Sequence, residues 1–226
     1  PLYRNPALAG IFNGNIRFTS AYRNQWASVT VPYETKAVST ELTFPIGYTN
    51  DLFTVGLQLS NDVAGDSKLG RTQFLPVFTF HKAFADEVSY LTIGAMGGLI
   101  QSQFDQSQLH FGSQYNSATN DWTCTRAFDI TRTNLTYWDA SAGLAFNSEF
   151  NDGTRYYYGA AVYHFLRSKV YFTDPTNSIL RPRFVLNGGI NFVTGNLDHL
   201  YMFGDAMMQG GNRQLLLGLY YSHIIN

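Results

Sequence analysis

The sequence predicts an all-β fold, an antiparallel transmembrane β-barrel of the outer-membrane type, from its composition, its two-residue periodicity and its connection lengths. Only 14% of the 226 residues are charged, against roughly 25% in soluble domains, and 16% are aromatic. Mean hydropathy is nevertheless −0.15. The longest charge-free apolar stretch, near 88–100, is shorter than the ~20 residues that a membrane helix needs. A barrel fits this composition, because its strands need apolar residues on one face only.

Apolar residues alternate with small or polar residues in segments along the whole chain, as in 52–60, 137–147 and 183–194. A period of two indicates β-strands and matches no helical period. We expect ten strands, near 16–23, 34–44, 52–60, 71–81, 88–101, 137–147, 154–164, 181–194, 199–208 and 213–223. The lipid-facing side should include Leu57, Leu59, Leu91, Ile93, Leu144, Phe184, Leu186 and Ile190. A soluble β-sandwich is the alternative, because alternation does not tell which face meets lipid.

Short and long connections alternate between the expected strands. The short ones are 45–51, 82–87, 148–153 and 195–198, and the longer ones are 24–33, 61–70, 102–136 and 165–180. Outer-membrane barrels have short periplasmic turns and longer extracellular loops. We therefore expect the longer set at one rim, outside the cell, with the short connection 209–212 as an exception at that rim.

The organisation expected from these patterns is a single barrel domain over 1–226, with a short N-terminal segment (1–15) and a long loop (102–136). The chain opens on Pro1 without a visible signal peptide, so we expect a processed or incompletely covered N-terminus. It stops directly after an expected strand, and we expect further strands beyond Asn226.

Several function classes have no support in the residues. The net charge is −1, and no block of Lys or Arg indicates nucleic-acid binding. The single Cys124 excludes an internal disulfide and a multi-cysteine metal site. The five histidines form no HExxH or paired-ligand motif, and we expect them to make hydrogen bonds in the lumen or at the interface. They are His81, His110, His164, His199 and His223. We therefore predict no catalytic residue, no cofactor, no metal and no enzyme activity.

Three further polar and aromatic features have competing interpretations. The Asn61-Asp62 and Gly65-Asp66 pairs resemble a calcium loop but are interpreted as a polar turn, because the bidentate Glu of such a loop is missing. Arg23 is expected to pair with a lumen carboxylate such as Asp139 or Glu41. Aromatic residues near strand ends predict interfacial girdles, or alternatively a ligand-stacking platform: Trp26, Trp122, Trp138, Tyr156, Tyr157, Tyr158, Tyr163, Tyr220 and Tyr221.

Short motifs also line up in order along the chain. They include Asn5-Pro6-Ala7-Leu8-Ala9-Gly10, Tyr22-Arg23-Asn24-Gln25-Trp26, Ser60-Asn61-Asp62-Val63-Ala64-Gly65-Asp66, Leu109-His110-Phe111-Gly112-Ser113-Gln114 and Tyr158-Gly159-Ala160-Ala161-Val162-Tyr163-His164. The series spans residues 5 to about 192 and resembles the PorP/SprF family of type IX secretion and gliding-motility membrane proteins. This resemblance implies a barrel of about fourteen strands, of which about ten are readable here.

The resemblance implies two kinds of role in the outer membrane. One branch of the family works with the periplasmic ring and peptidoglycan-binding components of the type IX machinery. The other binds the C-terminal targeting domain of a secreted adhesin-like protein and supports its export or surface anchoring. Outer-membrane lipid or lipopolysaccharide would surround the barrel. The alternative function is a passive channel or uptake barrel for small solutes.

Candidate partner-binding residues fall in three places. Asn5 and Pro6 precede the first strand, where the segment would plug the lumen, contact a periplasmic partner or form a disordered leader. Arg23, Gln25 and Trp26 close the first strand. The loop 102–136 is too long for an ordinary connection and carries aromatic residues among polar ones, which suits a partner-binding surface or a self-packed cap: Phe104, Phe111, Tyr115 and Trp122.

Overall fold

The computed structural model describes residues 2–12, 14–28, 31–48, 50–86, 88–109, 114–119, 121, 132–172, 178–195 and 198–223. Ten strands dominate these residues: β1 (Ile16–Gln25), β2 (Tyr33–Pro45), β3 (Leu52–Ala64), β4 (Leu69–Ala83), β5 (Tyr90–Gln103), β6 (Asn134–Glu149), β7 (Arg155–Tyr163), β8 (Arg183–Val193), β9 (Asp198–Gln209) and β10 (Asn212–His223). Two short 3-10 helices, η1 (Pro6–Leu8) and η2 (Gln106–Gln108), accompany them. No helix among the described residues is long and apolar enough to cross a membrane.

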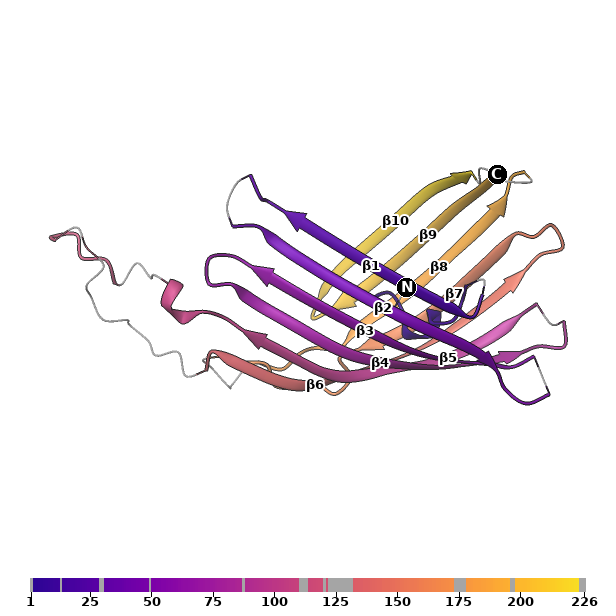
Figure 1. Ribbon diagram of the computed structural model, residues 1–226, viewed down its shortest axis with the longest axis horizontal. Helices are drawn as coiled ribbons and strands as arrows, with labels where there is room; N and C mark the ends of the chain where they lie inside the picture. The colour runs from indigo at the N-terminus through magenta and orange to yellow at the C-terminus, as the bar shows by residue number, and fades with distance from the viewer. Residues whose placement is uncertain are drawn as a thin grey trace.

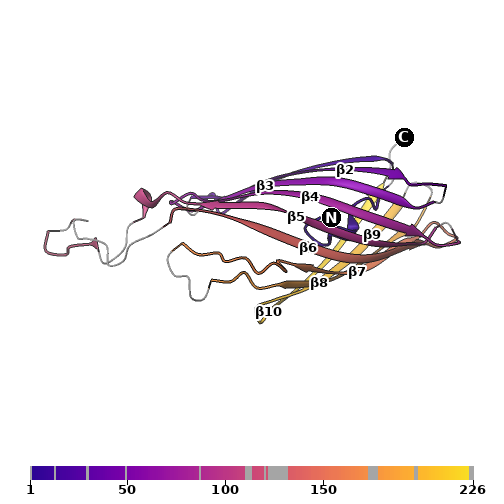
Figure 2. The same ribbon diagram turned by 90° about the horizontal axis from the view of Figure 1, so that it is seen from below.

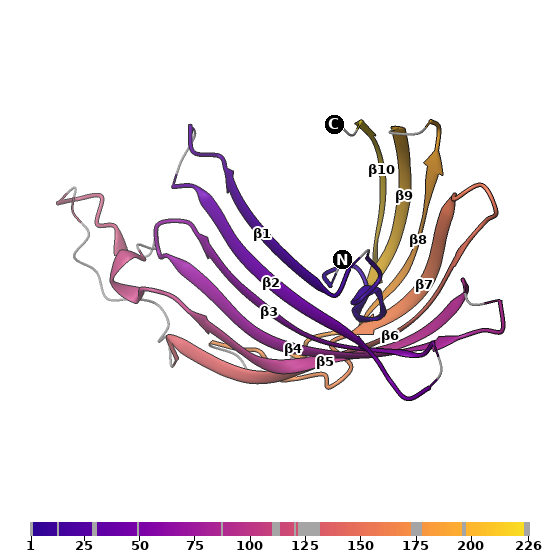
Figure 3. The ribbon, with the colours of Figure 1, turned by 45° about the vertical axis from the view of Figure 1, so that its right-hand side comes forward.

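The strands form a single antiparallel sheet in sequence order from β1 to β10. The sheet curls into a half-barrel, with β1 and β10 at its two edges (Figures 1 and 3). Within the described residues these two edge strands do not pair with each other. One curled sheet rules out the sandwich alternative and is consistent with an outer-membrane β-barrel. The prediction of ten antiparallel strands is confirmed.

The convex face is apolar, and the concave face combines buried polar side chains with apolar clusters. Six of the eight side chains predicted to face lipid are 40–58% exposed, and Leu57 and Ile190 are partly exposed on the same face. Some of their sequence neighbours on the concave face are buried and polar, such as Gln58 and Thr92, and others are buried and apolar, such as Ala145 and Val185. Polar residues on the inner face are typical of a barrel lumen, so the predicted orientation of the strands is confirmed.

The antiparallel order places alternate connections at opposite rims. Rim A carries the connections that follow β1, β3, β5, β7 and β9, and rim B carries those that follow β2, β4, β6 and β8. This grouping is the predicted one. At rim A, β9 and β10 are joined by the two-residue turn Gly210-Gly211, both with positive φ, which explains how the shortest connection of this rim is made.

The predicted long connection 61–70 is wrong. The ladder between β3 and β4 continues to the pair Ala64–Leu69, so only residues 65–68 form the turn. Asn61 donates to Thr72 Oγ1 at 2.9 Å and Asp62 accepts from Thr35 Oγ1 at 2.7 Å. These polar residues are therefore strand residues. β3 and β4 have 13 and 15 residues, longer than the ~9–11 that span a bilayer, and they run side by side along the sheet (Figure 2).

The predicted aromatic girdle is correct for some side chains only. Trp138, Tyr158 and Tyr221 are 64%, 58% and 62% exposed on the convex face, whereas Tyr157 and Tyr163 point into the concave face. Tyr163 is buried, and its hydroxyl donates to the Leu2 carbonyl at 2.8 Å. Because successive side chains of a strand point to opposite faces, the odd-numbered tyrosines of β7 face the concave side. Trp122 lies outside the described residues.

Candidate functional site: the filled concave face

The N-terminal segment 2–12 lies inside the half-barrel, against the concave face (Figure 3). Leu2 and all residues from Asn5 to Gly10 are buried, and η1 contacts β4, β5, β6 and β7. Apolar side chains of the segment join apolar clusters of the inner face: Leu2 and Ala9 pack with Val77 and Val185. Of the three arrangements expected for this segment, the plug is the one that the structure shows.

Asn5 fixes the segment to three strands. Its Oδ1 accepts from the Ala7 amide at 2.9 Å and so caps η1, as short polar side chains do at helix starts. Its Nδ2 donates to the Leu144 carbonyl of β6 and to Asn187 Oδ1 of β8, both at 3.0 Å, and to the Ala160 carbonyl of β7 at 3.3 Å. Because both ends of the amide are used, Asp or Ala at this position would lose bonds in a buried place.

Three glycines make the space that this segment occupies. A Cβ at Gly94 would lie 2.6 Å from the Ala7 nitrogen, and one at Gly159 would lie 2.8 Å from Asn5 Nδ2. A Cβ at Gly143 would overlap Asn5 Oδ1. The inner face of β5, β6 and β7 therefore admits the backbone of the segment only because these positions have no side chain.

Arg4 anchors the start of the segment to β9. Its Nε donates to both carboxylate oxygens of Asp205, at 2.8 and 2.9 Å. The guanidinium also lies 4.6 Å from the ring centre of Phe203 and 5.8 Å from that of Tyr157, a cation–π arrangement. Burial alone would lower the pKa of Arg4, but the hydrogen bond to Asp205 and the electrostatic interactions with Asp205 and Tyr157 together outweigh it, and the pKa is raised. Arg4 therefore stays charged in its socket.

Arg17 and Glu41 hold the other end of the segment. Glu41 is fully buried, and its Oε2 accepts from the Gly10 amide at 2.9 Å and from Arg17 Nη2 at 2.7 Å. The Arg17 guanidinium also lies 4.5 Å from the ring centre of Phe12. The ion pair therefore links β1, β2 and the segment.

The expected pairing of Arg23 with Glu41 or Asp139 is wrong. The register of β1 and β2 sets Arg17 opposite Glu41 and Arg23 opposite Thr35. Asp139 is instead engaged by His164 Nδ1 at 2.7 Å. Arg23 lies further along β1, at its rim A end, where it is exposed.

Removing the charge of Glu41 should strongly destabilise the protein. Glu41→Gln leaves the Arg17 guanidinium beside a neutral amide in a buried site, which costs on the order of 3–5 kcal/mol. Urea unfolding of detergent-solubilised protein measures this. Glu34→Gln is the matched control, because the exposed pair Glu34–Lys36 contributes about 0–1 kcal/mol. Equal losses of unfolding free energy in both variants would contradict a stabilising role of the Arg17–Glu41 ion pair.

His81 lies beneath Gly10 in a buried hydroxyl network. Its Nε2 lies 3.1 Å from both Thr54 Oγ1 and Thr79 Oγ1, and its Nδ1 lies 2.8 Å from Thr92 Oγ1. The ring is therefore satisfied by hydrogen bonds in the lumen, as predicted for this residue. Across the part of the chain that the structure describes, no group of three His, Cys, Asp or Glu could hold a metal ion. His110 lies outside that part.

A second segment covers the concave face near rim A. In the connection between β7 and β8, Val170, Phe172 and Leu180 pack against the buried cluster of Ile100, Leu135 and Tyr137. Phe104 meets Phe172 edge-on at 5.0 Å between ring centres, and Arg132 lies 5.1 Å from the ring centre of Tyr171. Both ends of the long loop 102–136 therefore rest on this segment.

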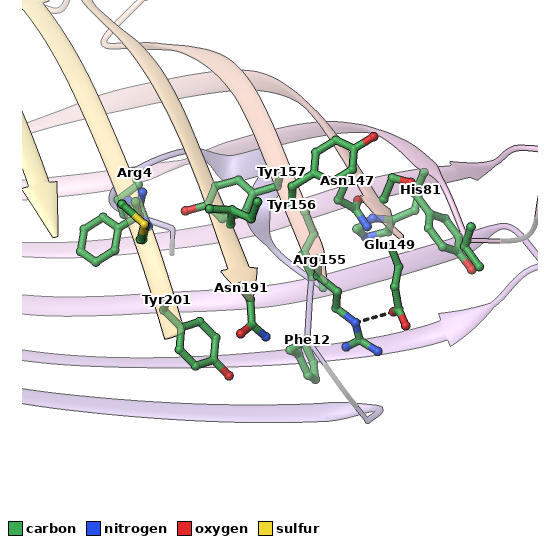
Figure 4. Close-up of a pocket in the computed structure, with 18 of the residues that line it drawn as sticks. Arg4, Phe12, His81, Asn147, Glu149, Arg155, Tyr156, Tyr157, Asn191 and Tyr201 are labelled. Carbon is green, nitrogen blue, oxygen red and sulfur yellow. Dashed lines mark hydrogen bonds and ion pairs between the residues drawn. The ribbon is translucent and has the colours of Figure 1, made fainter. Parts of the chain in front are cut away.

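A cleft of about 740 Å³ remains on the concave face at rim B. It lies between the end of the N-terminal segment and β5 to β10, and Phe12, Asn191 and Tyr201 line it (Figure 4). Arg155 and Glu149 form an ion pair within it. Tyr201 and Tyr220 stack at 4.3 Å between ring centres. The cleft ends at the filled part of the lumen.

The residues predicted to bind a partner do not form one site. Asn5 and Pro6 are buried in the N-terminal segment. Arg23, Gln25 and Trp26 lie at the rim A end of β1, where Trp26 is 63% exposed. Phe104 packs on Phe172 and Tyr115 is 41% exposed. Phe111 and Trp122 lie outside the described residues.

The anchors Arg4, Arg17 and Asp205 were missed in the sequence, and so were the glycines, whereas Glu41 was predicted as a lumen carboxylate but with Arg23 as its partner. A signal was present for the acids. Glu41 and Asp205 stand among apolar and small residues of strands, where a charge needs a buried partner.

Comparison with protein families identifies the chain. The family model described as "Type IX secretion system membrane protein PorP/SprF" matches residues 1–223. The chain belongs to the PorP/SprF family. No curated protein and no solved structure gave a match. As a PorP/SprF protein the chain is a membrane component of the type IX secretion system, a family of secretion components and not of enzymes. The matched range includes the N-terminal segment and all ten strands.

Proposed function

We propose that this PorP/SprF protein is an outer-membrane barrel that binds a protein partner and supports its export or its anchoring at the cell surface. The partner is a secreted adhesin-like protein, bound through its C-terminal targeting domain, or a periplasmic ring or peptidoglycan-binding component of the machinery. Family membership supports partners within the secretion system. The observation that carries the proposal is the concave face occupied by the chain's own N-terminal segment.

The competing function is a passive channel for small solutes. The polar inner face favours it, because a water-filled lumen needs such residues. However, Arg4 and Glu41 are committed to holding the segment in place, through Asp205 and Gly10. Gly94, Gly143 and Gly159 leave room on the inner face for the segment, which supports a lumen occupied by the chain itself rather than by open water. A filled lumen supports a binding function over conduction.

Rim A is proposed to face outside and rim B to face the periplasm, with the convex face in lipid. Rim A carries the long connections 104–133 and 164–182, whereas the described turns of rim B are short, as in outer-membrane barrels. The candidate partner residues Trp26, Phe104 and Tyr115 belong to rim A. In sequence, Phe111 and Trp122 belong to the same long loop.

The single cysteine allows a direct test of orientation and partner together. Cys124 falls in sequence within the 104–133 connection, so a membrane-impermeant maleimide should label it in intact cells. A bifunctional reagent at Cys124 should join the chain to a secreted protein, identified by mass spectrometry. Cys124→Ser is the control for both signals.

Two outcomes would count against the proposal in different ways. Labelling only after the outer membrane is opened would reverse the orientation. Labelling of Cys124 in intact cells without any protein adduct would argue against a surface partner at this loop.

A further inference from the structure

A second hollow, of about 690 Å³, lies at rim A where β8, β9 and β10 end. Its lining combines arginines with neutral amides: Arg181, Arg183, Met207, Gln209, Gly210, Asn212, Arg213 and Gln214. No carboxylate is among these lining residues. A hollow lined by several cations and amide donors has the chemistry of an anion site.

Two arginines of the concave face near rim A are incompletely satisfied. The Nε of Arg183 is buried without a hydrogen-bond partner, and so is the Nε of Arg71 on β4. Arg183 rests on the ring of Tyr163, 4.4 Å from its centre. A buried donor without an acceptor costs free energy, so an acceptor from outside the chain would be bound favourably.

Other arginines of the concave face have a carboxylate partner, and these arginines do not. Arg4 and Arg17 each have a carboxylate, in Asp205 and Glu41. Among the described residues, no ion pair joins a carboxylate to Arg71, Arg181 or Arg183. Asp139, on the concave face of β6, is engaged by His164. Asp62 stands opposite Arg71 in the pairing of β3 and β4, but in the part of the chain that the structure describes no carboxylate lies within salt-bridge distance of Arg181 or Arg183.

We propose that Arg181 and Arg183 bind carboxylate groups of an acidic polypeptide segment that enters the concave face at rim A. The proposal rests on the proposed function, in which the partner is a protein, and it names the chemistry of the bound segment. Arginine matches a carboxylate with two parallel hydrogen bonds, and the amides of Gln209 and Asn212 offer further donors.

The side on which the hollow opens favours a polypeptide over a lipid headgroup. Arg183 lies over Tyr163, whose hydroxyl meets Leu2 inside the half-barrel. Strand pairing sets Arg183 opposite Gln209, and Gln209 opposite Asn212, so all three face the concave side. Lipid phosphates would lie along the convex side, which only Arg213 faces.

The test is binding of a fluorescent acidic peptide of Asp, Glu, Ser and Gly to the full chain in detergent, followed by anisotropy. The Arg181→Gln/Arg183→Gln double variant should bind at least tenfold more weakly than the unmodified chain. Arg155→Gln, which removes the same charge type at rim B, is the matched control and should bind normally. A peptide with Asn and Gln in place of the acids should also bind at least tenfold more weakly.

A single variant guards against misfolding, because Arg181 is exposed and Arg181→Gln should weaken binding while leaving the unfolding midpoint unchanged. Equal peptide affinity in all variants would overturn the inference. Tight binding of inorganic phosphate or lipopolysaccharide through the same arginines, without binding of the acidic peptide, would also overturn it. Retained peptide affinity in the double variant, beside loss of export when the long loop is replaced, would reject this site and leave the proposed function standing.

Discussion

Replacement of residues 105–133 by Asn-Gly should abolish export or surface retention of the partner while the barrel stays in the membrane. With Phe104, the new residues make a three-residue connection, and the pair Gln103–Asn134 keeps the ladder of β5 and β6 closed. The removed segment carries the candidate partner residues Phe111, Tyr115 and Trp122. Interface energy is concentrated in a few aromatic side chains, so their joint removal should reduce export to background.

The control for this replacement is a Gly/Ser segment of the same length as 105–133. It keeps the reach of the loop and removes its side chains, so it should fail as completely as the short version. Export is measured as the amount of partner protein at the cell surface and in the medium. Electrophoresis of unheated and boiled samples shows whether the barrel is folded. Intact export together with raised small-solute conductance would favour the channel function.

Gly143→Val should expel the N-terminal segment from the concave face. The new Cβ would overlap Asn5 Oδ1, and a buried overlap of this kind costs about 1–3 kcal/mol or more. The segment can leave without disturbing any strand pairing, whereas β6 is fixed between β5 and β7. Hydrogen exchange of residues 2–12 should therefore rise towards that of an unfolded chain.

Gly188→Val is the matched control for this change. A Cβ at Gly188 has its nearest neighbour at 3.5 Å, the Tyr157 carbonyl oxygen, which is an ordinary contact. Its exchange pattern should match that of the unmodified protein. If the amides of residues 2–12 stayed protected in Gly143→Val, the missing side chains of Gly94, Gly143 and Gly159 would not be what gives the segment its space.

The strands were predictable because one local rule produces them. Lipid on one side and polar groups on the other impose a two-residue period, and that period located all ten strands and the outward side chains such as Leu144 and Phe184. The same rule failed at 61–70, where β3 and β4 continue past Asn61 and Asp62, which place polar side chains on both faces of β3. It also failed at Tyr157 and Tyr163, because a run of aromatic residues hides which of them face inward.

The interior arrangement was not predictable because it depends on contacts between distant residues. Arg4 and Asp205 are 201 positions apart, and neither lies in a motif that points to the other. Arg23 was predicted to pair with Glu41 or Asp139, and Arg17 was not considered. The pairing of β1 with β2 in space sets Arg17 opposite Glu41 and Arg23 opposite Thr35, and the sequence alone does not fix this register.

Planar-bilayer conductance of the full-length protein, with and without residues 2–12, tests the filled lumen most directly. Arg4, Asn5 and Gly10 all lie in the removed segment and hold it to β9, β6 and β2. If the segment fills the lumen, we expect almost no conductance for the intact protein and clear conductance steps for the shortened one. Equal and substantial conductance of both would show that the segment does not block the lumen, and would contradict a binding function founded on a filled barrel.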